Sequence, residues 1–133
     1  MRFLFAVFAI LLAGVSIDSR GAVASPDGKR VALLGTSNAN PYIGAWAKTF
    51  VKFATDAGMK VTNLNSNYDA AVQSQQIDDA IAQKFDMIVM VYVNDQAVVP
   101  ALTRAKAAGI PVVLVVTPLK KEYEELFTSY VGT

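Results

Sequence analysis

The sequence contains neither cysteine nor histidine. Without cysteine, the chain has no disulfide framework, no thiol nucleophile and no thiolate metal site. Without histidine, it lacks serine–histidine triads, imidazole proton shuttles and most kinds of zinc and copper site. Carboxylate chemistry remains open to its 11 acidic residues. Because so much of the usual catalytic repertoire is excluded, the composition favours a binding protein over an enzyme.

The sequence also has no excess of charge of one sign. Its 12 basic residues nearly balance the 11 acidic ones, and the formal net charge is +1. Without a basic block, nothing supports a nucleic-acid partner. The turn Gly35-Thr36-Ser37-Asn38 has neither the G-x-G-x-x-G spacing nor a Walker-type lysine, so we expect no nucleotide or other cofactor. A length of 133 residues suits one domain.

Residues 1–24 have the order of a secretory signal peptide. Arg2 provides a positive start, residues 3–15 carry no charge, and Ala22-Val23-Ala24 places cleavage before Ser25. The apolar run is shorter than the roughly 20 residues that a membrane-spanning helix needs. An uncleaved N-terminal anchor stays open as the alternative. We expect a cleavable signal peptide over residues 1–24 and export of residues 25–133 to the periplasm.

Beyond the leader, short apolar runs alternate with segments of helical period. Strands are expected at 31–34, 60–64, 87–91, 112–116 and, more briefly, 127–131. Helices are expected to start at Pro41, after Asp69, and after Asn94 or Asp95. Residues 120–125 fit a helical turn or a loop. This alternation predicts an α/β fold with a parallel sheet and helices on both faces.

Polar and aromatic residues follow three of the predicted strands. In an open parallel sheet, ligands bind beyond the carboxyl ends of the strands, where the strand order reverses. Amides, carboxylates and hydroxyls bind sugar hydroxyls, and aromatic faces cover sugar C–H groups. The sequence therefore predicts a site for a neutral polyol at this edge. Its candidate ligand-binding residues are Asn40, Tyr42, Tyr92, Asn94, Asp95 and Thr117.

Each candidate has a second interpretation. Asn40, Asn94 and Asp95 are also typical of residues that only cap a helix. Tyr42 is open between ligand contact and a ring that packs across the start of the first helix. Trp46, one turn further, is open between core, crevice and an interface between lobes.

Several short motifs occur in one order along residues 29–133. They are Asn40-Pro41-Tyr42, Gly58-Met59-Lys60-Val61, and the stretches 75–81, 86–89 and 108–113. With the leader, they resemble the ribose- and galactose-type periplasmic binding proteins that feed ABC importers. The same Rossmann-like lobe occurs in sugar-responsive repressors of the lac type, but those carry a DNA-binding helix-turn-helix where this chain has a leader.

The resemblance implies that Asn40 contacts a sugar and Tyr42 packs on its ring, while Tyr92 stands where a polar residue often reaches the ligand. Two positions depart from the family's pattern. Ile43 replaces a frequent second aromatic residue. Val116 and Thr117 stand where many sugar binders have an Asp-Arg pair. These departures leave the identity of the solute open.

The resemblance also implies that residues 25–133 are an incomplete N-terminal lobe, whose partner lobe would close over the ligand. The implied partners are a small polar solute, expected to be a sugar, and the membrane permease of an ABC importer. The full-length protein is expected to be a monomer. An exported module that signals occupancy to a membrane receptor or kinase is the alternative, and a carboxylate enzyme using Asp95 is a weaker one.

Overall fold

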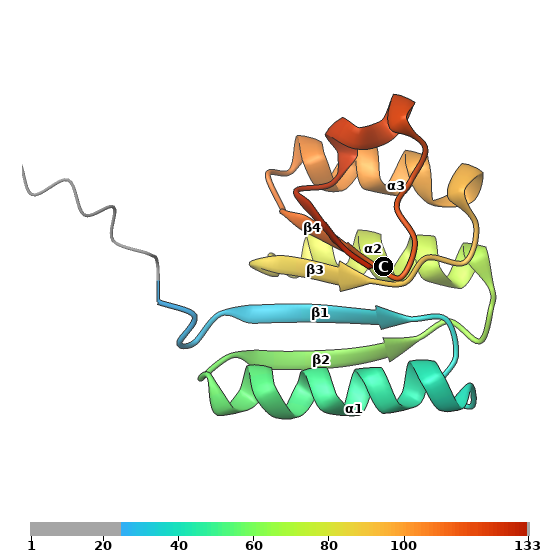
Figure 1. Ribbon diagram of the computed structural model, residues 1–133. Coiled ribbons are helices and arrows are strands. Elements are labelled where there is room, and N and C mark those ends of the chain that lie inside the picture. The colour runs from blue at the N-terminus through green and yellow to red at the C-terminus, as the bar shows by residue number, and fades with distance from the viewer. Residues whose placement is uncertain (1–24, 133) are drawn as a thin grey trace, which may run out of the picture.

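Five parallel strands form one sheet in the computed structural model, which describes residues 25–132 (Figure 1). The predicted signal peptide lies outside the described residues. The strands are β1 (Arg30–Gly35), β2 (Lys60–Asn65), β3 (Met87–Met90), β4 (Val112–Val115) and β5 (Ser129–Val131). Their order across the sheet is β2-β1-β3-β4-β5. The prediction of a parallel α/β fold is confirmed.

Helices cover both faces of this sheet. Helix α1 (Pro41–Asp56) lies against β1 and β2 on one face (Figure 1). Helices α2 (Ala70–Ala82) and α3 (Asp95–Ala107) pack together on the other face. A 3₁₀ helix, η1 (Lys121–Leu126), contacts α3 and leads into β5. Within residues 25–132, no helix has the length and apolar character needed to cross a membrane.

The helix boundaries follow from local chemistry. Side-chain oxygens of Asn40, Asp69 and Asn94 accept hydrogen bonds from backbone N–H groups in the first turns of α1, α2 and α3. Gly58 and Gly109 follow α1 and α3 with φ of +89° and +73°. Only glycine adopts this left-handed conformation without strain, so each helix ends shortly before its glycine.

The core consists of one layer on each side of the sheet. Along β1, Val31 and Leu33 face α1, whereas Ala32 and Leu34 face α2 and α3. All four are fully buried, which explains why this strand is continuously apolar instead of alternating. The layer under α2 and α3 is the larger of the two.

Several strand boundaries differ from the prediction, and β5, for example, begins at Ser129 and not at residue 127. Strand β4 ends at Val115 because Val116 has a φ of +77°, which no regular strand allows. Strand β3 ends at Met90, although the Val91 N–H still donates to the Leu34 carbonyl at 3.0 Å. Helix α3 also continues through Pro100, which has no N–H to donate within the helix.

Candidate functional site

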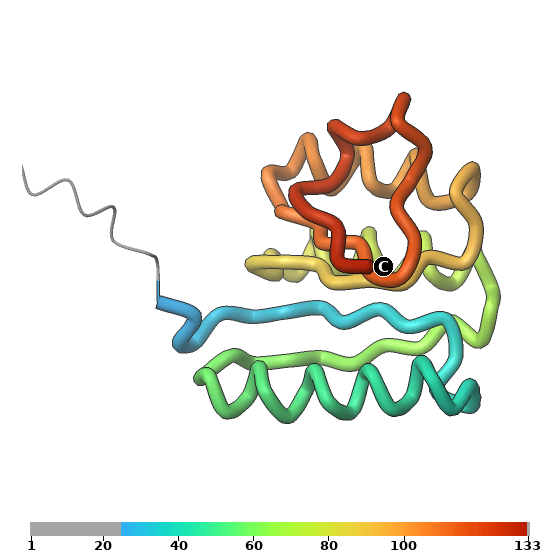
Figure 2. The backbone as a smooth tube through the Cα atoms, in the orientation of Figure 1, coloured from blue at the N-terminus to red at the C-terminus, as the bar shows by residue number. Residues whose placement is uncertain are grey.

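The strand order reverses between β1 and β3. The chain leaves β1 toward α1 on one face and leaves β3 toward α3 on the other. In open parallel sheets, ligands bind at the carboxyl ends of the strands beside such a switch point. Figure 2 shows the chain turning at the same side of the sheet after β1, β2 and β3. The loops predicted to bind ligand therefore surround this switch point.

Asn40 caps α1. Its Oδ1 atom accepts from the backbone N–H groups of Tyr42, at 3.0 Å, and Ile43, at 3.2 Å. Its Nδ2 atom donates to the hydroxyl of Tyr68 at 3.2 Å. Asn40 is thus the cap of α1, and its side-chain oxygen is occupied within the protein. One of the two amide hydrogens also has a partner.

Tyr42 does not pack across the helix start. The residue is 67% exposed and lines a cavity of about 320 Å³. Trp46, half-buried one turn later, lines the same cavity, as do Val115, Val116, Val131 and Gly132 at the ends of β4 and β5. Trp46 also packs on the core layer under α1. It is therefore part core and part cavity wall.

The loop after β3 carries the second group of predicted residues. The Oδ1 atom of Asn94 accepts from the Ala97 N–H at 3.0 Å, which makes Asn94 the cap of α3. Asp95 accepts from the Gln96 N–H at 3.0 Å, and its other oxygen lies 3.9 Å from the Lys120 ammonium. Asp95 thus keeps a half-buried, charged oxygen at this edge.

Tyr92 connects this loop to the one after β4. Its hydroxyl donates to the Pro118 carbonyl at 3.0 Å. Burial first, and then the negative charge of Asp95, raise the pKa of the Tyr92 phenol above its ordinary value. The phenol therefore stays protonated and able to donate throughout the neutral range.

Thr117 lies between two residues whose carbonyl groups accept hydrogen bonds from tyrosine hydroxyls. Tyr130 donates its hydroxyl to the Val116 carbonyl at 2.9 Å, and Tyr92 holds Pro118 on the other side. Val116 itself has a left-handed φ, which is strained for a β-branched residue. This short, constrained loop presents Thr117 at the surface.

The sequence analysis missed Gln73, which positions the β3 loop. This α2 side chain is only 2% exposed. Its Nε2 atom donates to the Val91 carbonyl at 3.0 Å, and its Oε1 atom accepts from the Val93 N–H at 2.9 Å. Gln73 therefore holds the backbone on both sides of Tyr92. The available signal was a glutamine one turn before Ile77, on the inward face of α2.

The sequence analysis also missed Tyr68, in the loop after β2. Its N–H donates to the Thr36 carbonyl at 2.9 Å, and the nearby Ser66 N–H donates to the Gly35 carbonyl at 3.2 Å. These bonds fasten the β2 loop onto the end of β1. The Tyr68 ring is 56% exposed and bonded to Asn40. The turn itself was predictable, but its contact with β1 was not.

The hydrogen bonds organise the edge into two groups. Asn40, Tyr42 and Tyr68 form one, and Tyr92 and Asp95 with the β4 loop form the other. Together they offer hydroxyls, amides, exposed aromatic surface and one carboxylate, a composition suited to a polar ligand. Across residues 25–132, no cluster of three or more acidic side chains is arranged to hold a metal ion.

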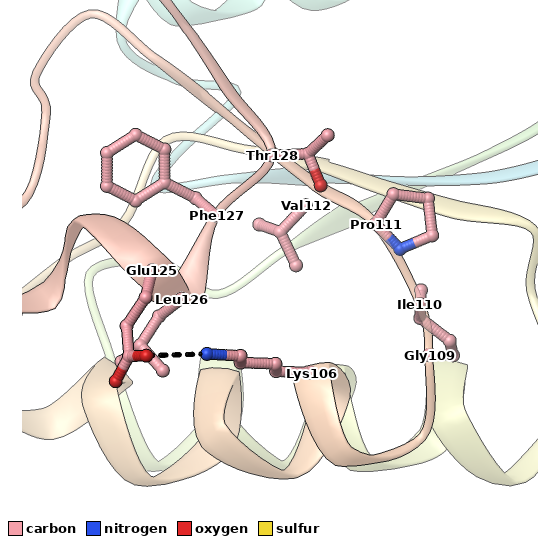
Figure 3. A pocket seen from close by; sticks show the side chains of 9 residues that line it. All are labelled: Lys106, Gly109, Ile110, Pro111, Val112, Glu125, Leu126, Phe127 and Thr128. Carbon is pink, nitrogen blue, oxygen red and sulfur yellow. Dashed lines mark hydrogen bonds and ion pairs between the residues drawn. The ribbon is translucent and has the colours of Figure 1, made fainter.

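A separate cavity of about 240 Å³ lies at the opposite edge of the sheet, where β4 and β5 begin (Figure 3). Lys106 and Glu125 face each other across it at 2.8 Å. The hydrogen bond from Lys106, followed by its charge, lowers the pKa of Glu125 below its ordinary value. Since this ion pair lies far along the strands from the switch point, it does not belong to the candidate site.

Comparisons with known proteins agree with the fold. Residues 31–133 match the family model described as the periplasmic binding protein domain. The ribose import binding protein of Bacillus subtilis is 30% identical over 76 residues, which are 57% of this chain and 25% of that protein. A D-apiose import binding protein of Paraburkholderia graminis is 34% identical over 85 residues, 64% of this chain and 27% of that protein. The chain thus spans only about a quarter to a third of the curated relatives it matches.

Solved structures show the same arrangement of strands and helices. A periplasmic ribose ABC transporter protein of Conexibacter woesei superposes with a TM-score of 0.70 at 25% identity, over 74% of this chain and 33% of that one. The arabinose-binding component of Shewanella sp. ANA-3, solved with L-arabinofuranose, gives a TM-score of 0.72 at 22% identity, over 77% and 34%.

These relatives are solute-binding proteins and not enzymes. They confirm the prediction of a binding protein. The match covers residues 31–133 and therefore includes many residues outside the short motifs that first indicated the family. The match with the family model runs from β1 through the end of the described sheet. This chain belongs to the periplasmic binding protein domain family.

Proposed function

We propose that the chain is the solute-binding part of an ABC import system and that it binds a small polar solute, a sugar, at the carboxyl edge of its sheet. The observation that carries this proposal is the exposed ring of Tyr42 beside the switch point. Hydrogen-bonding groups from the loops after β3 and β4 lie at the same edge. An aromatic face next to several donors and acceptors suits both surfaces of a sugar.

The six predicted ligand-binding residues enter this proposal in two roles. Tyr42, Tyr92, Asp95 and Thr117 would contact the solute directly. Asn40 and Asn94 cap helices through their side-chain oxygens and would contact the solute only through their amide hydrogens. The ribose and D-apiose named for the curated relatives support a sugar as ligand.

The proposal includes a place of action and a partner. Residues 1–24 would direct export to the periplasm and be removed, and residues 25–133 would form the N-terminal lobe. A second lobe, as the length of the relatives suggests, would close the crevice from the other side. The loaded protein would then deliver its solute to a membrane permease. Permease and ATPase genes beside the coding sequence would support this partner over a receptor or kinase.

An NMR titration of the ¹⁵N-labelled chain tests the site. D-ribose and D-glucose are added up to tens of millimolar, a range in which weak binding still shifts amide signals. We expect the shifts to cluster in the loops after β1, β3 and β4. Tyr42→Ala should reduce them, whereas Asn63→Ala, an exposed change on β2, should not. No shifts at this edge, or equal effects of the two variants, would show that the site is wrongly placed.

A further inference from the structure

We propose that Tyr68 is a ligand-binding residue and that it forms, with Asn40, a pair of hydrogen-bond donors for one hydroxyl oxygen of the solute. This inference rests on the proposed function and deepens it. Tyr68 lies in the loop after β2, which the predicted site does not include. It would add a fourth loop to the ligand-binding wall, on the β1 side of the crevice.

The position of Tyr68 at the switch point is determined by its backbone. The Tyr68 N–H donates to the Thr36 carbonyl at 2.9 Å, one residue beyond the end of β1. The neighbouring Ser66 is 2% exposed and donates its N–H to the Gly35 carbonyl at 3.2 Å. The two acceptors belong to the last residue of β1 and to the first residue after it, and both residues are buried. The Tyr68 ring therefore stands beside Asn40, with 56% of its surface exposed.

The hydrogen bonds of Asn40 and Tyr68 within the protein leave this pair two donors for a ligand. The Asn40 oxygen already accepts two backbone N–H groups, at 3.0 and 3.2 Å. The Asn40 amide donates one of its two hydrogens to the Tyr68 oxygen at 3.2 Å. A phenol that accepts a bond still has its own O–H to donate. One N–H of Asn40 and the O–H of Tyr68 are thus two donors on atoms 3.2 Å apart, which can converge on a single oxygen.

The adjacent carboxylate is engaged elsewhere. Asp69 follows Tyr68 directly, and its Oδ1 atom accepts from the Ala71 and Val72 N–H groups at 2.8 and 3.0 Å. This carboxylate therefore serves the start of α2. A sugar hydroxyl oxygen can accept both donors, and the exposed face of Tyr42 in the first turn of α1 can cover the adjoining C–H surface.

The backbone conformation that places the Tyr68 ring there is strained. Tyr68 has a φ of +64° and Asn67 a φ of +50°. The left-handed region is strained for tyrosine, whereas asparagine enters it more readily. Glycine or asparagine would make the same turn with less strain. Such strain is concentrated at functional sites, where the position of one side chain matters.

The test compares Tyr68→Phe with Tyr123→Phe in the same D-ribose titration. Each variant removes one hydroxyl and keeps the ring, so the fold is preserved. Tyr123 lies in η1 and packs on the core, away from the crevice. We expect Tyr68→Phe to raise the Kd about fivefold, the equivalent of one hydrogen bond, and Tyr123→Phe to leave it unchanged. Equal Kd values for the wild type and Tyr68→Phe would overturn the inference.

A panel of monodeoxy sugars identifies the contacted oxygen. For the analogue that lacks this hydroxyl, the wild type and Tyr68→Phe should bind equally, because neither forms the bond. If the difference between them persists for every analogue, the proposed hydroxyl contact is wrong. If the wild type shows no shifts with any sugar, the proposed function itself fails, and this inference fails with it.

Discussion

Asparagine and glutamine side chains organise the candidate site by bonding to the backbone. Asn40 and Asn94 start two helices through their oxygens, and Gln73 holds the loop that carries Tyr92. At the scale of single residues, the side-chain oxygen of Asn40 therefore positions the backbone, while its amide group is the part proposed to contact a ligand.

Asn40 allows these roles to be separated. Asn40→Ala should lower the free energy of unfolding by about 1 kcal/mol because α1 loses its cap. Asn40→Asp should keep most of that stability, since aspartate caps equally well, yet lose the amide donor to Tyr68. Urea denaturation of both variants, with Asn63→Ala as the exposed control, measures the effect. If Asn40→Asp is as unstable as Asn40→Ala, the cap is not what Asn40 contributes.

Gln73→Leu tests the support of the β3 loop. The change leaves the Val91 carbonyl and the Val93 N–H without their partner, so we expect a loss of about 1–3 kcal/mol in unfolding free energy. The amide signals of residues 91–93 should shift as well. Gln75→Leu on the exposed side of α2, where Gln75 bonds only Asp79, should have little effect. Similar losses in both variants would contradict a specific role for Gln73.

At the scale of elements, the amino ends of the strands are held together by charge. Asp86, just before β3, accepts from the Arg30 N–H at 2.8 Å and from the Lys29 ammonium at 3.1 Å. Arg30 also lies over the Phe85 ring at 4.3 Å. These contacts join the start of β1 to the start of β3. They are made at the edge of the sheet opposite the candidate site.

Asp86 makes this junction sensitive to acid. The backbone bond from Arg30, and then the bond from Lys29, lower the pKa of Asp86 in the folded protein. Its stabilising contribution is therefore complete above the ordinary carboxyl pKa of about 4 and disappears as the pH falls through the lowered folded value. In urea denaturation from neutral to acidic pH, Asp86→Asn should lose less stability than the wild type. Identical pH profiles would show that this carboxylate is not linked to folding.

At the scale of the whole molecule, the described residues would supply one wall of the proposed ligand-binding crevice. Loops from β1, β2, β3 and β4 line it from a single side. Small-molecule sites generally bury most of the ligand surface, and a single wall provides a smaller part of those contacts. The relatives are about three to four times longer than their matched segments.

This geometry predicts weak binding by the 133-residue chain. In isothermal calorimetry, D-ribose should bind with a Kd in the millimolar range, because one wall supplies only part of the enclosing contacts. The wild type and Asn63→Ala should behave alike. A micromolar or tighter Kd would contradict the view that a second wall is needed.

Secondary structure was predictable because it depends on neighbours in the chain. The continuous apolar run of β1, the cap residues Asn40 and Asp69, and Gly58 each indicated a boundary that the structure confirms. The end of β4 was placed one residue late. Valine in a left-handed conformation contradicts its local preference, and here the loop is held by tyrosines from β5 and from the β3 loop.

The sequence by itself determined that this chain is an α/β lobe whose polar loops meet at one edge, because period, capping and composition are local properties. It also determined the absence of thiol and imidazole chemistry. Only the tertiary structure decided what each polar residue does there. Whether Asn40 meets a backbone N–H, Tyr68 or a ligand depends on how the β2 loop lies on β1. That arrangement comes from pairing between strands 30 residues apart, which no local pattern encodes.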